Sequence, residues 1–70
     1  MRIEYSSHVQ EKMQSRAVLL VELLDTVFLP DIIRKRKGQY FAQRKLERGT
    51  LRVVYEASTT HIKVITLYWM

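Results

Sequence analysis

The periodicity of the apolar residues changes once along this chain, at Pro30. Before Pro30, apolar residues recur at intervals of three and four, which is typical of helices with one buried side. After Pro30, apolar and polar residues alternate in successive runs, as in strands of a sheet with one covered face. Proline also disfavours helical backbone in the residue before it, here Leu29. This order predicts an α+β domain in which helices come first and strands follow.

A first helix of about ten residues is predicted to follow Ser7. Ser7 is the expected N-cap, and Gln10 is the residue that reaches back to it. Val9, Met13 and Ala17 are spaced by four and form the expected buried stripe. Before this helix, the alternating residues 3–5 are a candidate edge strand.

A second helix is predicted to end before Pro30. Its expected core-facing residues are Leu20, Leu24, Val27 and Phe28, and its expected solvent-facing residues are Glu22, Asp25 and Thr26. The segment Val18–Leu23 holds more apolar residues than one stripe needs, and Trp69 and Met70 add to them. These residues indicate a homodimer seam or a groove for a partner protein. The alternative is that the helix is simply enclosed between the first helix and the sheet.

The predicted strands are Ile32–Arg36, Tyr40–Leu46, Leu51–Ala57 and His61–Trp69. Their connections are short, so neighbouring strands are expected to pair antiparallel. The predicted fold is therefore two N-terminal helices packed on an antiparallel sheet of three to four strands, in a single domain covering residues 1–70.

The separation of polar and apolar faces is clearest when Ala57 opposes His61, and we expect Leu46 to oppose Leu51. This register places Lys63 and Ile65 on the helix-covered side of the last strand. It also places Lys45 opposite Arg52 on the uncovered side. Two like charges across a strand pair repel each other, and an anion between them relieves the repulsion.

Seventy residues make a small domain of marginal stability, and no cysteine is present to form a disulfide. We expect the remaining support to come from an oligomer or a bound partner. No apolar run approaches the roughly 18 residues that a membrane span needs. No secretory signal is recognised either, so a cytoplasmic protein without membrane association is expected.

The basic residues are concentrated in one part of the chain. Eight of the twelve lie between residues 32 and 53, where Glu47 is the one acid, so this part has a net charge of +7. They are Arg34, Lys35, Arg36, Lys37, Arg44, Lys45, Arg48 and Arg52. Such an asymmetry predicts contact with a polyanion, most commonly nucleic acid. The alternative is that exposed basic and aromatic residues keep the sheet edges soluble.

Arginine presents a planar fork to phosphate, and aromatic rings can stack on unpaired bases. The expected contributors on the sheet are Arg44, Lys45, Arg52, Tyr40, Tyr55 and Tyr68. On the first helix, His8, Lys12 and Arg16 are spaced by four and share one side. A neutral imidazole there is a candidate general base near pH 7, with the two cations holding a phosphate. A solvated helix side is the alternative, and His61 is expected at the surface.

Several kinds of site have no sequence signature here. Gly38 and Gly49 are the only glycines, so no glycine-rich phosphate loop is present. No histidine or acidic pair has metal-ligand spacing, and no serine has nucleophile-elbow context. Catalysis is therefore expected to need neither metal nor cofactor. RNA suits that condition because its 2′-hydroxyl supplies the nucleophile.

Short motifs along nearly the whole chain resemble a known family. They are Tyr5-Ser6-Ser7-His8 with Met13 and Arg16, Pro30-Asp31, Gly38-x-Tyr40, Leu51-Arg52-Val53-Val54-Tyr55 and Val64-Ile65-Thr66. The family is the prokaryotic domain of unknown function 4258, and the chain more distantly resembles BrnT and RelE/ParE-like toxins of type II toxin–antitoxin modules. Two positions depart from that pattern, since members often have Arg in place of Lys12 and Gly in place of Ala17.

The resemblance implies a RelE-like fold and the activity of a toxin that is a metal-independent endoribonuclease. It implies RNA as the substrate, including ribosome-associated mRNA, and an adjacent antitoxin that covers the basic face. The expected catalytic residues are His8, Arg16, Arg52 and Tyr55. The expected nucleic-acid-binding residues are Lys12, Arg34, Lys35, Arg36, Lys37, Tyr40, Arg44, Lys45 and Tyr68. Two alternatives stay open: a non-catalytic module that binds nucleic acid or protein, and a ParE-like inhibitor of DNA gyrase.

Overall fold

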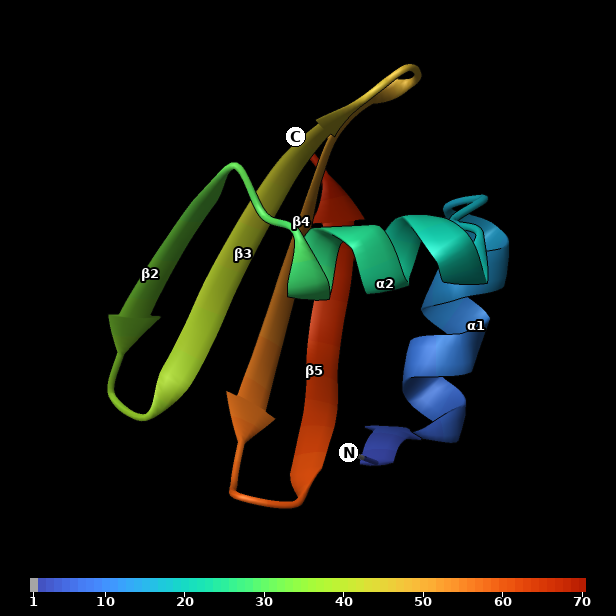
Figure 1. The fold of residues 1–70 in the computed structure, drawn as a ribbon. Helices are drawn as coiled ribbons and strands as arrows, with labels where there is room; N and C mark the ends of the chain where they lie inside the picture. Colours follow the sequence, from blue (N-terminus) through green and yellow to red (C-terminus); the bar gives the residue numbers. More distant parts are fainter. Residues whose placement is uncertain (1) are drawn as a thin grey trace.

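Five strands form one sheet in the order β1-β5-β4-β3-β2, and two helices pack against it (Figure 1). The computed structural model describes residues 2–70. The elements are β1 (Arg2–Tyr5), α1 (Ser7–Ser15), α2 (Leu20–Phe28), β2 (Ile32–Arg36), β3 (Gln39–Leu46), β4 (Gly49–Ala57) and β5 (His61–Trp69). The strands from β2 to β5 pair antiparallel with their neighbours, as predicted.

The predicted fold class is wrong in the number and direction of the strands. β1 is a fifth strand that runs parallel to β5, with Ile3 opposite Ile62 and Tyr5 opposite Val64. The sheet is therefore mixed, and the expected antiparallel RelE-like sheet of three to four strands is not found. The antiparallel rule applies to strands joined by short turns. Both helices and three strands separate β1 from β5 along the chain, so no hairpin fixes the direction of β1.

Helix α1 begins one residue earlier than predicted, because Ser6 rather than Ser7 is the N-cap. The Ser6 backbone is extended, and its side-chain oxygen accepts a hydrogen bond of 3.1 Å from the Val9 amide. Val9 is buried as predicted, and Met13 packs against the core. Ala17 lies beyond the helix, at a positive φ of 53°, so it does not continue the buried stripe.

The buried side of helix α2 was predicted only in part. Val27 is buried as predicted, but Leu23 and Thr26 are buried with it, whereas Leu20 and Phe28 are each 51% exposed. The helix has apolar residues on more than one side, so periodicity alone does not select the buried stripe. Thr26 can be buried because its hydroxyl donates to the Glu22 carbonyl at 2.8 Å.

Two tight turns fix the register of the basic strands. Lys37 and Gly38 both have positive φ, 51° and 80°, which is the pattern of a type I′ hairpin between β2 and β3. The next turn also has two residues, so Leu46 pairs with Gly49 and not with Leu51. As a result, Gln43 lies opposite Arg52, and the predicted repulsive pair with Lys45 does not form.

The pairing of β4 with β5 also differs from the prediction. Ala57 pairs with Ile62 rather than His61, and the register shifts once more beside Tyr55. A bulge of this kind changes which side chains of a strand face the core. Ile62 and Val64 are buried as a result, in place of the expected Lys63 and Ile65.

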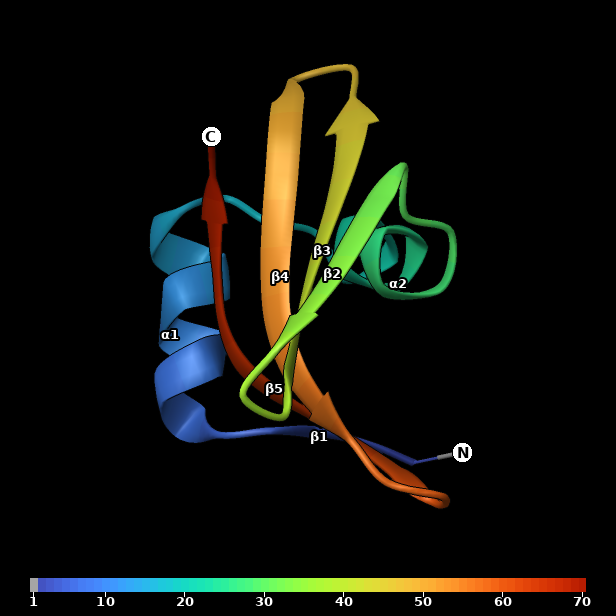
Figure 2. The same cartoon turned by 90° about the vertical axis from the view of Figure 1, so that its left-hand side faces the viewer.

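One face of the sheet, called the helix face below, carries the core. Its buried residues come from both helical segments and from the three inner strands: Val9, Val18, Leu23, Val27, Ala42, Leu51, Val53, Tyr55, Ile62, Val64 and Leu67. Helix α1 packs on β5 and β1, and α2 packs on β3 and β4. The opposite side of the sheet is called the open face. In Figure 1, β2 lies at the border of the sheet, on the side away from α1, and Figure 2 shows the same arrangement turned by 90°. Neither helix contacts β2.

Candidate anion-binding face

Three arginines share the open face of the sheet. Arg52 follows Leu51 and precedes Val53, both of which are fully buried on the helix face. Since side chains alternate along a strand, Arg52 projects from the open face. Arg34 pairs with Phe41, which pairs with Val54, so this row also lies on the open face. Arg36 is two residues further along β2 and projects the same way.

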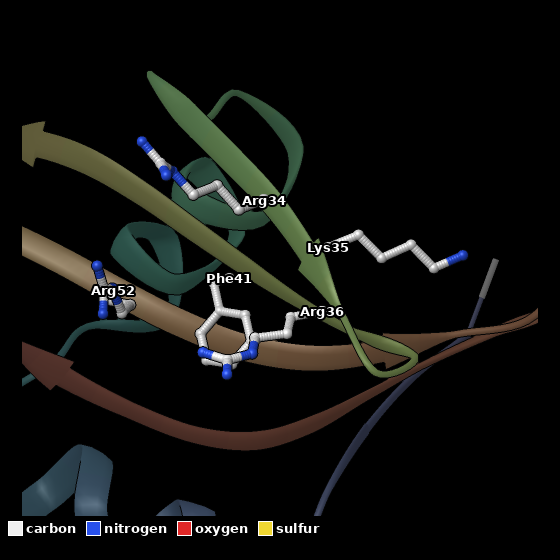
Figure 3. A pocket seen from close by; sticks show the side chains of 5 residues that line it. All are labelled: Arg34, Lys35, Arg36, Phe41 and Arg52. Atoms are coloured by element: carbon white, nitrogen blue, oxygen red, sulfur yellow. The ribbon is translucent and has the colours of Figure 1, made fainter.

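These three arginines line one pocket together with Phe41. The pocket has a volume of about 400 Å³, and its lining residues are Arg34, Lys35, Arg36, Phe41 and Arg52. Figure 3 shows the Lys35 amine extending away from the other four side chains. This amine lies 5.2 Å from the centre of the Tyr40 ring. Three guanidinium groups and one aromatic ring therefore face the pocket, and no carboxylate in the described part of the chain lines it.

Arg52 is held in place by side chains on both neighbouring strands. Its Nε donates to the Gln43 Oε1 atom at 3.1 Å, and its Nη2 donates to the same oxygen. Its Nη1 donates to the Tyr68 hydroxyl at 3.1 Å. Neither the amide of Gln43 nor the hydroxyl of Tyr68 is a carboxylate, so these partners form no ion pair with Arg52. A fixed guanidinium loses less entropy when it binds an anion than a freely rotating one.

One cation from α1, Lys12, and one from its C-cap, Arg16, reach the border of the sheet along β5. The Lys12 ammonium donates to the Thr66 hydroxyl at 2.8 Å, and Thr66 pairs with Val54 of the open-face row. An Arg16 guanidinium nitrogen donates to the Leu67 carbonyl. That carbonyl lies on the part of β5 that β1 does not cover, because β1 ends opposite Val64. Arg16 therefore hydrogen-bonds a carbonyl at the uncovered edge of β5, and Lys12 adds positive charge beside the open face.

The remaining basic residues of the middle stretch do not join this group. Lys35 and Arg44 project from the other side of the sheet, since each lies between open-face residues. Arg44 donates to the Leu29 carbonyl at 2.5 Å. Lys37 lies in the β2–β3 turn. Lys45 lies three residues after the buried Ala42 and so projects from the open face, but it does not line the pocket. The basic residues of the middle stretch are thus divided between both faces of the sheet and the turns.

Arg48 has a structural arrangement of its own. From the β3–β4 turn it binds the Glu22 carboxylate at 2.5 Å and donates to the Ala17 carbonyl. Its guanidinium also lies 4.9 Å from the centre of the Trp69 ring. The hydrogen bond from Arg48 holds the pKa of Glu22 below its usual value, although burial opposes this effect. Arg48 therefore joins α2 and the segment before it to the sheet, and its charge is largely neutralised by Glu22.

The four expected catalytic residues are not brought together. Tyr55 is buried on the helix face and stacks on Tyr40, with ring centres 5.3 Å apart. Arg52 projects from the opposite face. Burial raises the pKa of the Tyr55 hydroxyl, and the neighbouring Tyr40 raises it further. His8 is exposed on α1, and Arg16 is bound at the β5 edge, so neither shares a pocket with Arg52.

Two residues of the open face were missed in the sequence. Phe41 lines the pocket, and Gln43 orients Arg52. Phe41 alternates with the buried Ala42, which is a signal that it faces away from the core. Gln43 could not be placed opposite Arg52 because the length of the β3–β4 turn was misjudged by two residues.

The comparisons with known proteins place the chain in a family. It matches the domain of unknown function (DUF4258) over residues 5–69, and it therefore belongs to that family, as its motifs predicted. No curated protein and no solved structure matches the chain. The expected similarity to BrnT and RelE/ParE-like toxins has no support from these comparisons. Within residues 2–70, no helix has the length and apolar character needed to cross a membrane.

Proposed function

We propose that this protein binds single-stranded RNA through the open face of its sheet. The observation that carries the proposal is the pocket in which Arg34, Arg36 and Arg52 surround Phe41 without a lining carboxylate. Guanidinium groups bind phosphate oxygens in a forked geometry. An aromatic ring beside them offers a stacking surface for an unpaired base, which is how open sheets commonly bind single strands.

The arrangement fits a single strand better than a duplex. The pocket is one open depression on a sheet, and the two helices in residues 2–70 pack on the other face, so neither projects from the open face to enter a groove. Tyr68 and Gln43 add hydroxyl and amide groups beside Arg52. These groups can hydrogen-bond a ribose 2′-hydroxyl, which distinguishes RNA from DNA. A cytoplasmic location, expected from the sequence, would give the protein access to mRNA and ribosomes.

Neighbouring basic residues on β2 supply a matched pair of variants. Arg36 faces the pocket, whereas Lys35 directs its amine away from it (Figure 3). Arg36→Gln and Lys35→Gln remove the same charge from adjacent positions. Binding of a labelled RNA of about 12 nucleotides is measured by fluorescence anisotropy between about 50 and 200 mM salt.

The logarithm of the binding constant is plotted against the logarithm of the salt concentration. Three phosphate contacts predict a slope of about −2 for wild type, at about −0.7 per contact. Arg36→Gln is expected to reduce the slope by about 0.7, whereas Lys35→Gln leaves it nearly unchanged. Equal losses in the two variants would mean that total charge, and not the open face, governs binding. A DNA strand of the same sequence tests the preference for RNA.

Metal-independent RNA cleavage is a second candidate function, favoured by the surroundings of Tyr68. The Tyr68 hydroxyl accepts from Arg52, and Lys12 contacts Thr66 on the same strand. In this proposal the phenolate form of Tyr68, with two cations nearby, takes the proton of the 2′-hydroxyl and becomes neutral. The 2′-oxygen then bonds to phosphorus, the bond from phosphorus to the 5′-oxygen breaks, and the leaving 5′-oxygen takes a proton from water, while Arg52 stabilises the charge that develops on phosphate. Tyr68 thus replaces Tyr55, which is buried on the other face.

Cleavage and binding are separated by one variant. Tyr68→Phe removes the hydroxyl but keeps the ring, and it is expected to abolish cleavage of cellular RNA in the presence of a chelator while binding persists. Unchanged cleavage by Tyr68→Phe contradicts the role of its hydroxyl. If the wild-type protein does not cleave RNA, binding without catalysis remains the proposed function. Loss of DNA supercoiling without RNA binding would instead indicate the gyrase alternative.

A further inference from the structure

β2 is an uncovered border of the sheet. It pairs with β3 on one side and has no strand on the other side in the described residues 2–70. All five of its residues are exposed, and neither helix contacts it. The other border strand, β1, has four residues and is contacted by α1. The sheet therefore has one long edge at which a further strand can be added.

The hairpin geometry shows which backbone groups are free on this edge. In a two-residue hairpin the pair that closes the turn, here Arg36 and Gln39, exchanges hydrogen bonds. Along an antiparallel pair such bonded positions alternate with non-bonded ones. Lys35 and Ile33 are the non-bonded positions, so their N–H and C=O groups point away from β3. They offer two donors and two acceptors to a neighbouring strand.

The side chains of β2 give this edge a defined chemical order. Ile32 and Ile33, which are 46% and 48% exposed, present apolar surface on both sides of the strand at one end. Arg34, Lys35 and Arg36 present positive charge on both sides at the other end. An added strand therefore meets apolar surface first and cations afterwards, whichever face of the sheet its side chains occupy.

We propose that the free edge of β2 binds an extended acidic segment of a partner protein, which adds a sixth strand to the sheet. In antiparallel pairing, which is the more stable geometry, three acidic residues lie opposite Arg36, Lys35 and Arg34. Two apolar, β-branched residues then follow opposite Ile33 and Ile32. The partner's segment thus reads, in chain order, acidic, acidic, acidic, apolar, apolar.

A second copy of this chain is a poorer occupant. Antiparallel pairing of β2 with its own copy would place Arg34 opposite Arg34 and bring six cations into one strand pair. Like charges directly across a strand pair are destabilising, and basic residues on an edge normally prevent such self-pairing. An acidic segment removes this repulsion and also pairs the free backbone groups.

The test uses synthetic peptides and the full chain. The matched peptide carries Glu-Glu-Glu-Val-Val between flanking serines, and the control peptide carries the same five residues in the order Glu-Val-Glu-Val-Glu. Binding of labelled peptides is measured by anisotropy, and the amides of Ile33 and Lys35 are followed by hydrogen exchange. The matched peptide is expected to bind about tenfold more tightly and to protect both amides. Equal affinity of the two peptides would overturn the proposal, because charge alone would then suffice.

Backbone pairing is tested separately from charge. Ile33→Pro removes an outward N–H that β3 does not use, so the fold tolerates it at an edge. The variant is expected to bind the matched peptide about tenfold more weakly than wild type. A matched peptide N-methylated at alternate residues tests the same bonds on the wild-type chain if the proline variant unfolds. Retained binding in either case, or self-association that Ile33→Pro abolishes, would overturn the proposal. Neither readout involves RNA, so the result is independent of the proposed function.

Discussion

Replacing Ala17 by glycine is expected to stabilise the protein. Ala17 follows the C-terminus of α1 at φ 53°, a left-handed conformation that glycine adopts without strain. The Val18 amide donates to the Met13 carbonyl at 2.8 Å, and the Ala17 amide donates to the Gln14 carbonyl at 3.2 Å. These two bonds form a Schellman motif, in which the position of Ala17 is usually glycine.

Two opposing effects set the magnitude. A residue with a β-carbon in the left-handed region is destabilised by roughly 1–2 kcal/mol. Glycine loses roughly 0.5–1 kcal/mol more backbone entropy than alanine on folding. The difference predicts a gain of about 0.5–1 kcal/mol for Ala17→Gly, which raises Tm by roughly 3–6 °C in a domain of this size.

Thermal and urea unfolding followed by circular dichroism measure this difference. Gln14→Gly is the control, because Gln14 is exposed inside α1, and glycine there is expected to destabilise by about 0.5–1 kcal/mol. Ala17→Val is expected to destabilise, since a β-branched side chain tolerates positive φ poorly. An Ala17→Gly variant with the same or a lower Tm than wild type would refute the strain argument.

Three further predictions concern ionisable groups. Glu22→Gln is expected to destabilise by about 1 kcal/mol at neutral pH, because Glu22 binds Arg48, whose side chain is nearly half exposed. Since the folded pKa of Glu22 lies below 4.5, this difference should persist above pH 4.5 and disappear as the pH falls through the folded pKa, which urea unfolding over a pH series tests. A difference in unfolding free energy between wild type and Glu22→Gln that persists in acid would contradict this prediction. The pKa of Tyr55 is raised above 10.0 by burial and by Tyr40, so stability that it contributes is present below pH 10 and is lost as the pH rises further. Above pH 10, the free energy of unfolding should therefore fall less steeply with pH for Tyr55→Phe than for wild type. The same pH dependence in both proteins would contradict a raised pKa of Tyr55. Arg52→Lys keeps the charge but cannot bind Gln43 and Tyr68 together, so RNA affinity should fall about threefold to tenfold; unchanged affinity would show that the fork is not needed.

The positions of the strands after Pro30 in the sequence were predicted well, because alternation and short turns are local properties. The Lys37–Gly38 turn, for example, carries its own positive-φ signal in glycine. The parallel pairing of β1 with β5 was not predictable in this way, since it joins segments about 60 residues apart. The buried side of α2 was also misjudged, because its apolar residues surround the helix and only contact with β3 and β4 selects Leu23 and Val27.

The candidate site was predicted in part for a related reason. Charge density along the sequence pointed to the segment that holds Arg34, Arg36 and Arg52, and these three residues line one pocket. Sequence proximity could not show that Lys35 and Arg44 project from the other face, or that Arg48 binds Glu22. The face of each residue depends on strand register, and an error of one residue moves every side chain of a strand to the opposite side.

The most direct test of the open-face account is a nuclear magnetic resonance titration of isotope-labelled protein with a short single-stranded RNA. The account predicts saturable shifts in the guanidinium signals of Arg34, Arg36 and Arg52 and in the ring signals of Phe41 and Tyr68. The ring signals of Tyr40 and Tyr55, which stack on the helix face, should stay in place. Shifts confined to the helix face, or spread equally over both faces, would contradict the account.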